Sequence, residues 1–293
     1  MFYKKSLGEK IFDCFNCVVL LFLVLATLYP CWYVLVASVS DPIEIFASNG
    51  MLFLPKGFSL SSYVSVLKNE QLWMGYRNTL IYVVCGGILS VMLTVAGAFG
   101  LTRKGLPGRN LMTFLVMFTM YFHGGLIPTY LIVRSVGLVD SPLAMILVNA
   151  VTTYNLIITI SYFRGMPDSL EEAAKIDGAG DYTVLFRIML PLAKPIIAVI
   201  SLYYMVEIWN NFMTALIYLN DRKYFPLQMI LREILIQNNT DAVAASGTSD
   251  DAQAYAENLK YAIIVFSTVP ILCVYPFIQK YFVKGIMIGA IKG

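Results

Sequence analysis

The residues of this chain that could do chemistry are mainly polar side chains set in apolar surroundings, near positions 149–155 and 203–211. The candidates are Asn149, Tyr154, Asn155, Tyr203, Glu207, Asn210 and Asn211. Amides and carboxylates hydrogen-bond hydroxyl groups, and aromatic rings offer flat apolar faces, so both clusters could contact a sugar. Residues 203, 207, 210 and 211 share one face of a helix. The alternative is that they hydrogen-bond a neighbouring helix inside a membrane.

Catalytic chemistry finds little support in the sequence. A P-loop requires Gly followed by Lys, and this dipeptide is absent, so we expect the chain not to hydrolyse ATP. His123 is the one histidine, and no Gly-x-Ser-x-Gly motif accompanies it. The five cysteines lie in or beside apolar runs and indicate small buried thiols rather than a metal site. A net charge of +3 is too small to indicate nucleic-acid binding.

The elements that must position these residues are membrane helices. The chain is 58% hydrophobic and 13% charged, whereas soluble domains carry roughly 25% charged residues. A membrane helix needs about 20 mostly apolar residues, and six stretches meet this requirement. They are residues 14–38, 78–101, 111–133, 143–164, 195–219 and 260–282. The sequence therefore predicts an all-α polytopic protein, with residues 1–293 forming one transmembrane domain.

Positive charge predicts how this domain is oriented. With the N-terminus inside, most of the 21 lysines and arginines lie in the inner segments, as the positive-inside rule requires. Six spans then place both termini in the cytoplasm. The segment at 220–259 lies outside, and its polar run at 237–251 is typical of a solvent-exposed loop.

The inner segment between the fourth and fifth spans, residues 168–190, predicts two short helices. Asp168 can cap the first helix, with Glu171 completing a capping box. Gly178 can end this helix in the left-handed conformation. Asp181 can cap the second helix, which Pro191 limits. We expect a compact helical elbow, too polar to enter the bilayer.

This elbow carries the pattern E-A-A, three residues, G, nine residues, I-x-L-P. The matching residues are Glu172, Ala173, Ala174, Gly178, Ile188, Leu190 and Pro191. In this pattern the chain resembles the membrane subunits of bacterial ATP-binding-cassette importers. The resemblance implies a type I importer permease fold, in which the elbow docks in a cleft of a separate ATPase subunit. It assigns ATPase coupling to these motif residues and to Asp177, which directly precedes Gly178.

Three further segments narrow the resemblance. Trp209 to Phe212 and Leu219 to Asp221 are similar to the fifth span of maltose-type sugar permeases, as is the tail from Gln279 to Gly285. The run from Phe122 to Tyr130 resembles a subgroup that imports oligosaccharides and polysaccharide fragments.

The resemblance also implies a set of partners. It implies a multi-pass subunit of a bacterial plasma membrane that forms half of a carbohydrate pathway. The partners would be a second permease, two ATPases that hold ATP and Mg²⁺, and an extracytoplasmic binding protein. This chain itself would bind no cofactor. Within the outer loop, Asn238, Asn239 and Thr240 could compete for sugar hydroxyls, or the loop could be a spacer.

Two other functions stay open at this point. A permease of the same superfamily could carry a non-sugar solute, although the span-five and tail patterns argue against it. A membrane enzyme or an ion channel is the alternative from another class. The elbow motif and the missing catalytic constellation argue against both.

Overall fold

The computed structural model describes residues 6–47, 50–244 and 250–290, and it describes no side chain within 237–253, 274–275 or 277–290. The described residues form helices joined by turns, with one isolated antiparallel bridge between Ser40 and Phe58. The chain divides into two compact units. The first comprises Met1–Glu70 with Glu233–Val269, and the second comprises Gln71–Arg232 with Pro270–Gly293.

The first unit contains the N-terminal helix and the residues that lead from it to α3. Its helices are α1 (Leu7–Ser38), α2 (Pro42–Phe46), α3 (Ser61–Lys68), most of α14 (Leu227–Ala244) and the first half of α15 (Asp250–Ala290). Asn258 of α15 joins the C-terminal end of α1 to α3. Its amide donates to the Ala37 carbonyl at 2.9 Å and accepts from the Ser62 hydroxyl at 2.6 Å. The end of α1 is therefore tied to α3 and α15 by buried hydrogen bonds.

The second unit is built around one long helix, α4. Its elements are α4 (Glu70–Thr102), α5 (Arg109–Phe118), α6 (Leu126–Ser135), α7 (Pro142–Leu147), α8 (Thr153–Arg164), α9 (Asp168–Ile176), α10 (Asp181–Thr183), the π-helix η1 (Val184–Met189), α11 (Leu190–Leu192), α12 (Lys194–Asn210), α13 (Met213–Tyr218) and the 3₁₀ helix η2 (Arg222–Tyr224). The first residues of α14 and the second half of α15 complete it. No proline interrupts α4, so it runs unbroken through the unit.

Among the described residues, three helices are long and apolar enough to cross a membrane. They are α1, α4 and the Ala254–Cys273 part of α15. A fourth candidate joins Asp181–Leu192 to Lys194–Asn210 across an 81° bend. The remaining apolar stretches are interrupted, where Gly125 and Asn149 have positive φ values and where Asn211 is extended. Non-helical backbone at membrane depth is stable only where protein buries it or where it lines a cavity.

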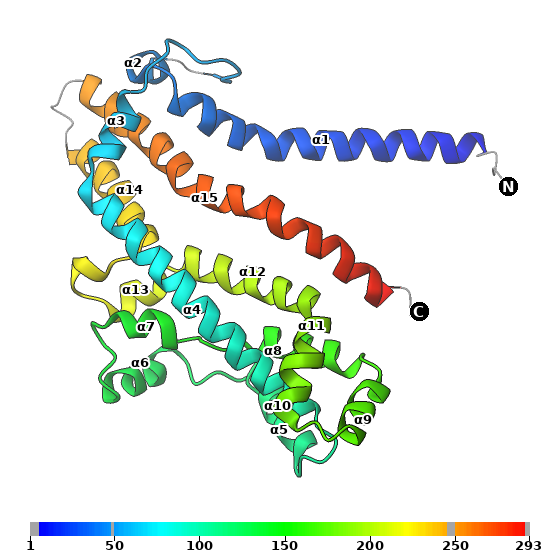
Figure 1. The fold of residues 1–293 in the computed structure, drawn as a ribbon. Coiled ribbons are helices and arrows are strands. Elements are labelled where there is room, and N and C mark those ends of the chain that lie inside the picture. The colour runs from blue at the N-terminus through cyan, green and yellow to red at the C-terminus, as the bar shows by residue number, and fades with distance from the viewer. Residues whose placement is uncertain (1–5, 48–49, 245–249, 291–293) are drawn as a thin grey trace. The chain divides into compact units, whose positions relative to one another are not determined.

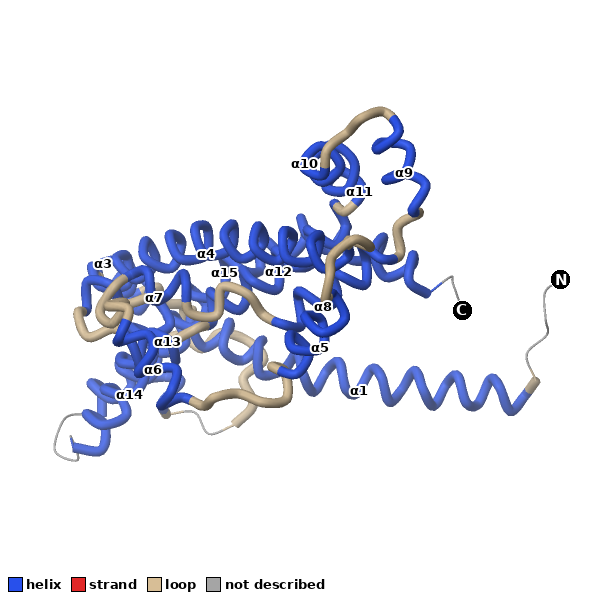
Figure 2. Tube along the Cα trace, turned by 90° about the horizontal axis from the view of Figure 1, so that it is seen from below, coloured by secondary structure: helices blue, strands red, loops and turns tan. Residues whose placement is uncertain are grey.

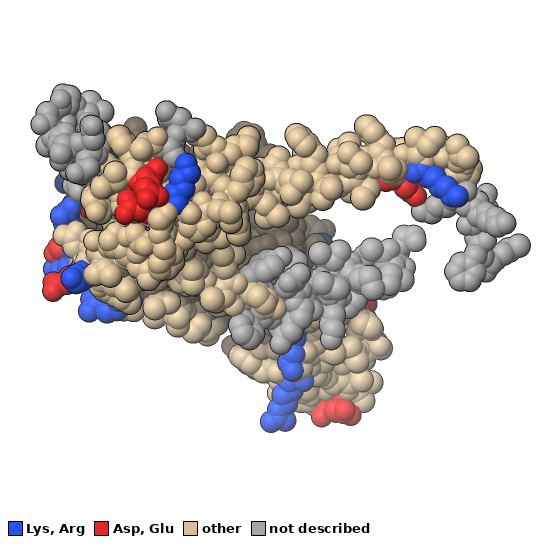
Figure 3. Space-filling view, turned by 90° about the horizontal axis from the view of Figure 1, so that it is seen from above, with Lys and Arg blue, Asp and Glu red and all other residues tan. Residues whose placement is uncertain are grey.

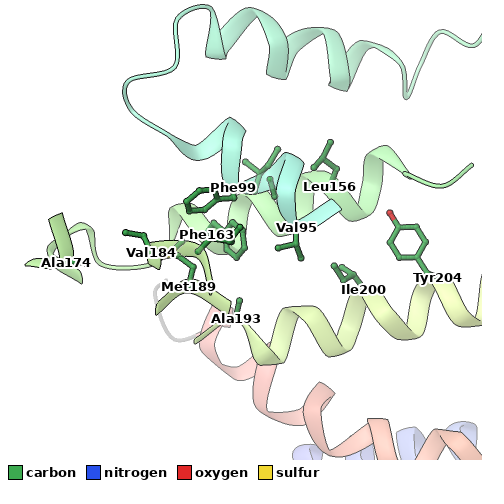
Figure 4. Close-up of a cluster of buried hydrophobic side chains, with 13 residues drawn as sticks. Val95, Phe99, Leu156, Phe163, Ala174, Val184, Met189, Ala193, Ile200 and Tyr204 are labelled. Atoms are coloured by element: carbon green, nitrogen blue, oxygen red, sulfur yellow. The ribbon is translucent and has the colours of Figure 1, made fainter. Parts of the chain in front are cut away.

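A hydrophobic cluster fastens α4, α8 and α12 to the helices between α8 and α12 (Figure 4). Phe99 of α4, Phe163 of α8 and Ile200 of α12 are each less than a tenth exposed. Ala174 and Met189 join them from α9 and η1. Since these residues come from five helical elements, the cluster holds the elbow against α4, α8 and α12.

The surface outside this cluster is largely apolar. Figure 3 shows charged side chains confined to small areas of the face it presents. Leu20 and Ile88 are each more than half exposed, which fits contact with lipid or another subunit. The expectation of buried thiols is wrong for this chain taken alone. All five cysteines are free and exposed, since they lie on helix faces that no other described part covers.

Candidate functional site

The segment between α8 and α12 forms an elbow that protrudes from one end of the second unit (Figures 1 and 2). It consists of α9, a turn, and the continuous helical run of α10, η1 and α11. The chain then bends by 81° at Ala193 before entering α12, where Pro195 occupies the first turn. Two helical segments therefore lie where the sequence predicts them.

The caps of these helices differ from the predicted ones. The N-cap of α9 is Pro167, and Asp168 is the first helical residue. Likewise Gly180, not Asp181, is the N-cap of α10. Both carboxylates still lie in a first turn, where negative charge is favourable. Gly178 has φ +77° and ends α9 as predicted, with its N–H donating to the Lys175 carbonyl at 3.0 Å.

The motif residues divide into two groups by exposure. Ala174 is buried, and Ile188 and Leu190 are partly buried against the same core cluster. The others point away from the core and are exposed: Glu172, Ala173, Asp177, Gly178 and Pro191. The buried residues therefore hold the elbow in place, while the exposed residues are available to a partner.

Three exposed apolar side chains on the elbow were not among the predicted site residues. Ile176, Tyr182 and Phe186 are 86%, 82% and 62% exposed, although they lie on the elbow. Apolar side chains gathered on a protruding element indicate a protein contact. The available signal was that these apolar residues occur in a hairpin too polar for the bilayer, where Ile176 follows Glu172 by one helical turn. They enlarge the candidate docking surface beyond the motif.

Helix α9 is also ion-paired to the end of α4. Arg103 Nη1 lies 2.5 Å from Glu171 Oε1, and Lys175 Nζ lies 2.8 Å from the same oxygen. Lys104 Nζ contacts Asp168 Oδ2 at 2.7 Å. Burial raises the pKa of the Glu171 carboxyl, but the hydrogen bond from Lys175 and the charge of Arg103 outweigh burial and hold this pKa below its usual range. Asp168 and Glu171 thus anchor the elbow instead of capping it.

A buried hydroxyl network joins α12 to α4 and to the start of α8. The Tyr204 hydroxyl lies 2.6 Å from Thr94 Oγ1 and accepts the N–H of Thr152 at 3.1 Å. Tyr204 is 1% exposed. The hydroxyl therefore satisfies backbone where the chain between α7 and α8 is not helical. Tyr204 lies within the polar stretch at 203–211 but was not among the predicted pathway residues.

Four of the predicted pathway residues lie around this network. Tyr154 is 55% exposed, and its ring centroid is 6.2 Å from that of Tyr203. Glu207 is exposed in an otherwise apolar groove that Tyr203 and Trp209 also line. Asn155, in contrast, is 2% exposed. Tyr154, Tyr203 and Glu207 thus come together on accessible surface, whereas Asn155 belongs to the interior.

The other predicted amides have local structural partners. Asn211 is partly buried, donates to Thr214 Oγ1 at 2.8 Å, and accepts the Thr214 N–H at 3.0 Å. Asn210 donates to the Val206 carbonyl at 2.9 Å and is exposed. Asn149 is exposed in the left-handed conformation between α7 and α8. Asn211 therefore shapes the break between α12 and α13, and its amide is already occupied there.

The predicted loop residues Asn238, Asn239 and Thr240 lie outside the residues whose side chains are described. Their backbone belongs to α14, which extends to Ala244. The described residues therefore offer two surfaces for binding, the exposed side of the elbow and the groove that Glu207 lines.

Comparison with known proteins gives consistent matches. The family described as "Binding-protein-dependent transport system inner membrane component" matches residues 72–288. The polygalacturonan/rhamnogalacturonan transport system permease protein YtcP of Bacillus subtilis is 40% identical, covering 97% of this chain and 99% of that protein. Protein LplC of the same organism is also 40% identical, covering 97% and 96%.

A solved structure extends the match to the fold. One chain of a bacterial ABC transporter involved in the import of the acidic polysaccharide alginate superposes with a TM-score of 0.86. It is 33% identical in sequence, and the match covers 96% of this chain and 100% of that one.

Proposed function

Because the chain belongs to the binding-protein-dependent transport system inner membrane component family, we propose that it is a transmembrane subunit of an ATP-driven carbohydrate importer. It forms half of the pathway for an oligosaccharide. We assign this substrate class because a polygalacturonan/rhamnogalacturonan permease is 40% identical to this chain over 97% of its length. The likeness to a chain of an alginate importer supports it.

In this proposal the chain crosses the plasma membrane six times with both termini inside, as one permease domain. The interrupted stretches at 111–133, 143–164 and 195–219 cross as broken helices, whose irregular backbone faces the pathway or a second permease. The exposed positions of Tyr154 and Glu207, with the partly buried Tyr203 between them in the chain, lie near two of these breaks and support that placement.

The partners follow from the elbow. One chain offers one elbow, and closure of an ATPase dimer requires two, so the assembly contains a second permease and two ATPase subunits. ATP and Mg²⁺ belong to the ATPases. Glu172, Ala173 and Asp177 meet the ATPase, together with the exposed apolar residues Ile176 and Tyr182. An extracytoplasmic binding protein delivers the sugar on the opposite side.

Reconstitution of the full transporter tests the proposal. The complex is placed in lipid vesicles with ATP inside and is offered its binding protein with pectic, alginate-derived or neutral oligosaccharides outside. We expect ATP-dependent uptake of at least one oligosaccharide and ATP hydrolysis that rises with loaded binding protein. Stimulation only by phosphate or a polyamine would favour the non-sugar alternative. Ion flux without ATP, or turnover of a substrate by this chain alone, would contradict a transport subunit.

The outer loop needs its own experiment. Its residues near Asn238 either reach the binding protein's sugar or act as a spacer. Deleting residues 241–251 in frame distinguishes the two. A loop that reaches the sugar predicts that uptake and stimulated ATP hydrolysis both fall while basal hydrolysis persists. A spacer predicts that both stay near their original values.

A further inference from the structure

Helix α4 is fastened at both ends to segments that the proposed function assigns to different partners. Near one end it is joined to the elbow, which would meet the ATPase. Near the other it is joined to residues 223–227, which lead into α14 and the proposed binding-protein loop. The two attachment regions, near Asn78 and Phe99, are 21 residues apart, or about 32 Å along a helix.

The attachment to the elbow depends on Arg103. Its guanidinium lies 4.0 Å from the ring centroid of Phe99 and ion-pairs with Glu171. The Arg103 and Glu171 side chains are 16% and 25% exposed, whereas those of Lys104 and Asp168 are 73% and 64% exposed. Shielded pairs contribute more than solvent-exposed ones, so the Arg103 pair is the stronger link.

The attachment at the other end consists of side chains on α4 that bond to backbone. Asn78 Nδ2 donates to the carbonyls of Lys223 and Phe225, at 2.7 and 3.0 Å. The Tyr82 hydroxyl donates to the Tyr224 carbonyl at 2.8 Å. Thr79 Oγ1 accepts the N–H of Leu227 at 2.8 Å. These bonds hold residues 223, 224, 225 and 227 by their backbone, regardless of their side chains.

Close backbone packing reinforces this second attachment. A Cβ added at Gly75 would lie 3.0 Å from the Leu227 Cα and 2.6 Å from the Ile230 Cδ1. Pro226 and Leu227 are fully buried there. The segment therefore cannot shift along α4 without breaking several contacts at once.

The covalent route from the elbow to α12 is less regular than α4. The chain passes from the elbow through the π-helix η1 and the 81° bend before α12 begins. A π-helix and a sharp bend are places where helical hydrogen bonding is irregular. Helix α4 has neither, and it meets the elbow directly where Phe99 joins the hydrophobic cluster and where Arg103 pairs with Glu171.

From this geometry we infer that α4 is the strut that couples the ATPase-facing elbow to the binding-protein-facing segment 223–227, with Arg103 and Asn78 as its positioning residues. The inference rests on the proposed function. Movement of the elbow is transmitted through the Arg103–Glu171 pair to α4. The bonds from Asn78 and Tyr82 then carry it to residues 223–227.

The test uses the complete transporter in vesicles and measures ATP hydrolysis with and without loaded binding protein. Arg103→Ala and Asn78→Ala should each reduce the stimulation about fivefold or more, within the usual range of coupling between sites. Basal hydrolysis and the binding-protein concentration for half-maximal effect should stay unchanged. The double variant should be no more impaired than the more impaired of the two single variants, because both substitutions interrupt one path. Lys104→Ala, which removes only the exposed pair, is the matched control.

Two milder variants separate positioning from folding. Arg103→Lys keeps the charge and should restore part of the stimulation, and Tyr82→Phe removes one hydroxyl from the second attachment. If Arg103→Ala does not assemble, Glu171→Gln breaks the same pair from the other side. Variants that assemble and retain full stimulation overturn the inference alone. A wild-type transporter that no loaded binding protein stimulates overturns the proposed function, and the inference with it.

Discussion

The hydroxyl oxygens of Tyr204 and Thr94 lie 2.6 Å apart and join α12 to α4 inside the protein. The same tyrosine oxygen accepts the N–H of Thr152. One side chain thus supports a helix pair and also satisfies a backbone donor beside a break. Because an unpaired donor is costly in a membrane interior, this contact should matter for stability.

Tyr204→Phe should lower the free energy of unfolding by about 1 kcal/mol, since hydrogen bonds between membrane helices are typically worth this much or slightly less. The measurement is the thermal unfolding midpoint of the purified protein in lipid nanodiscs. Tyr154→Phe removes a hydroxyl from a half-exposed tyrosine and is the control. Equal effects of the two substitutions would show that the buried network contributes nothing specific.

Gly178→Ala should strain the end of α9 by about 1 kcal/mol, because alanine disfavours the left-handed conformation. Within the described part of the chain no heavy atom lies within 4 Å of the added Cβ, so the effect comes from the backbone alone. The stimulation of ATP hydrolysis by loaded binding protein should fall. Gly180→Ala is a matched control, since Gly180 has open space and φ −75°. Stimulation that survives Gly178→Ala unchanged would remove the turn from the coupling mechanism.

Asp140 should tolerate replacement by asparagine but not by alanine. Its Oδ1 accepts the N–H groups of Asn220 and Asp221, each at 2.9 Å, and its φ is +59°. Asparagine can supply the same acceptor and adopts this conformation, whereas alanine does neither well. We expect Asp140→Ala to lower the free energy of unfolding by about 1–2 kcal/mol.

Asp140→Gly separates the two causes in the same unfolding assay. Glycine relieves the strain but lacks the acceptor, so its midpoint should lie between those of the alanine variant and the wild type. An asparagine variant as unstable as the alanine variant would mean that charge, and not the acceptor, matters here.

Acid should weaken the elbow's attachment through Glu171. A carboxyl whose pKa is lowered on folding contributes stability above its ordinary pKa and loses it as the pH falls through the folded value. The pKa of Glu171 lies below 4.5, so the loss should appear as the pH falls below about 4.5. Glu171→Gln should flatten this part of the unfolding midpoint's pH profile. Glu172→Gln, on the exposed neighbour, should leave it intact, and identical profiles for all three proteins would contradict the assignment.

The sequence by itself was enough for several features, because they depend on residues close together in the chain. The elbow motif has fixed spacing, Gly178 ends a nine-residue helix, and long apolar runs at 14–38 and 78–101 predict α1 and α4. Each of these follows from local conformational preference or from hydrophobicity. Membership of the importer family followed from the same motif.

Tertiary structure decided the features that depend on distant partners. Asp168 and Glu171 pair with Lys104 and Arg103, more than 60 residues earlier, so local capping rules misassigned them. Hydrophobicity measures how readily a segment enters lipid, and it does not report whether its backbone will stay helical. That choice depends on contacts such as the Tyr204 hydroxyl on Thr152, which exist only once α4, α8 and α12 have packed together.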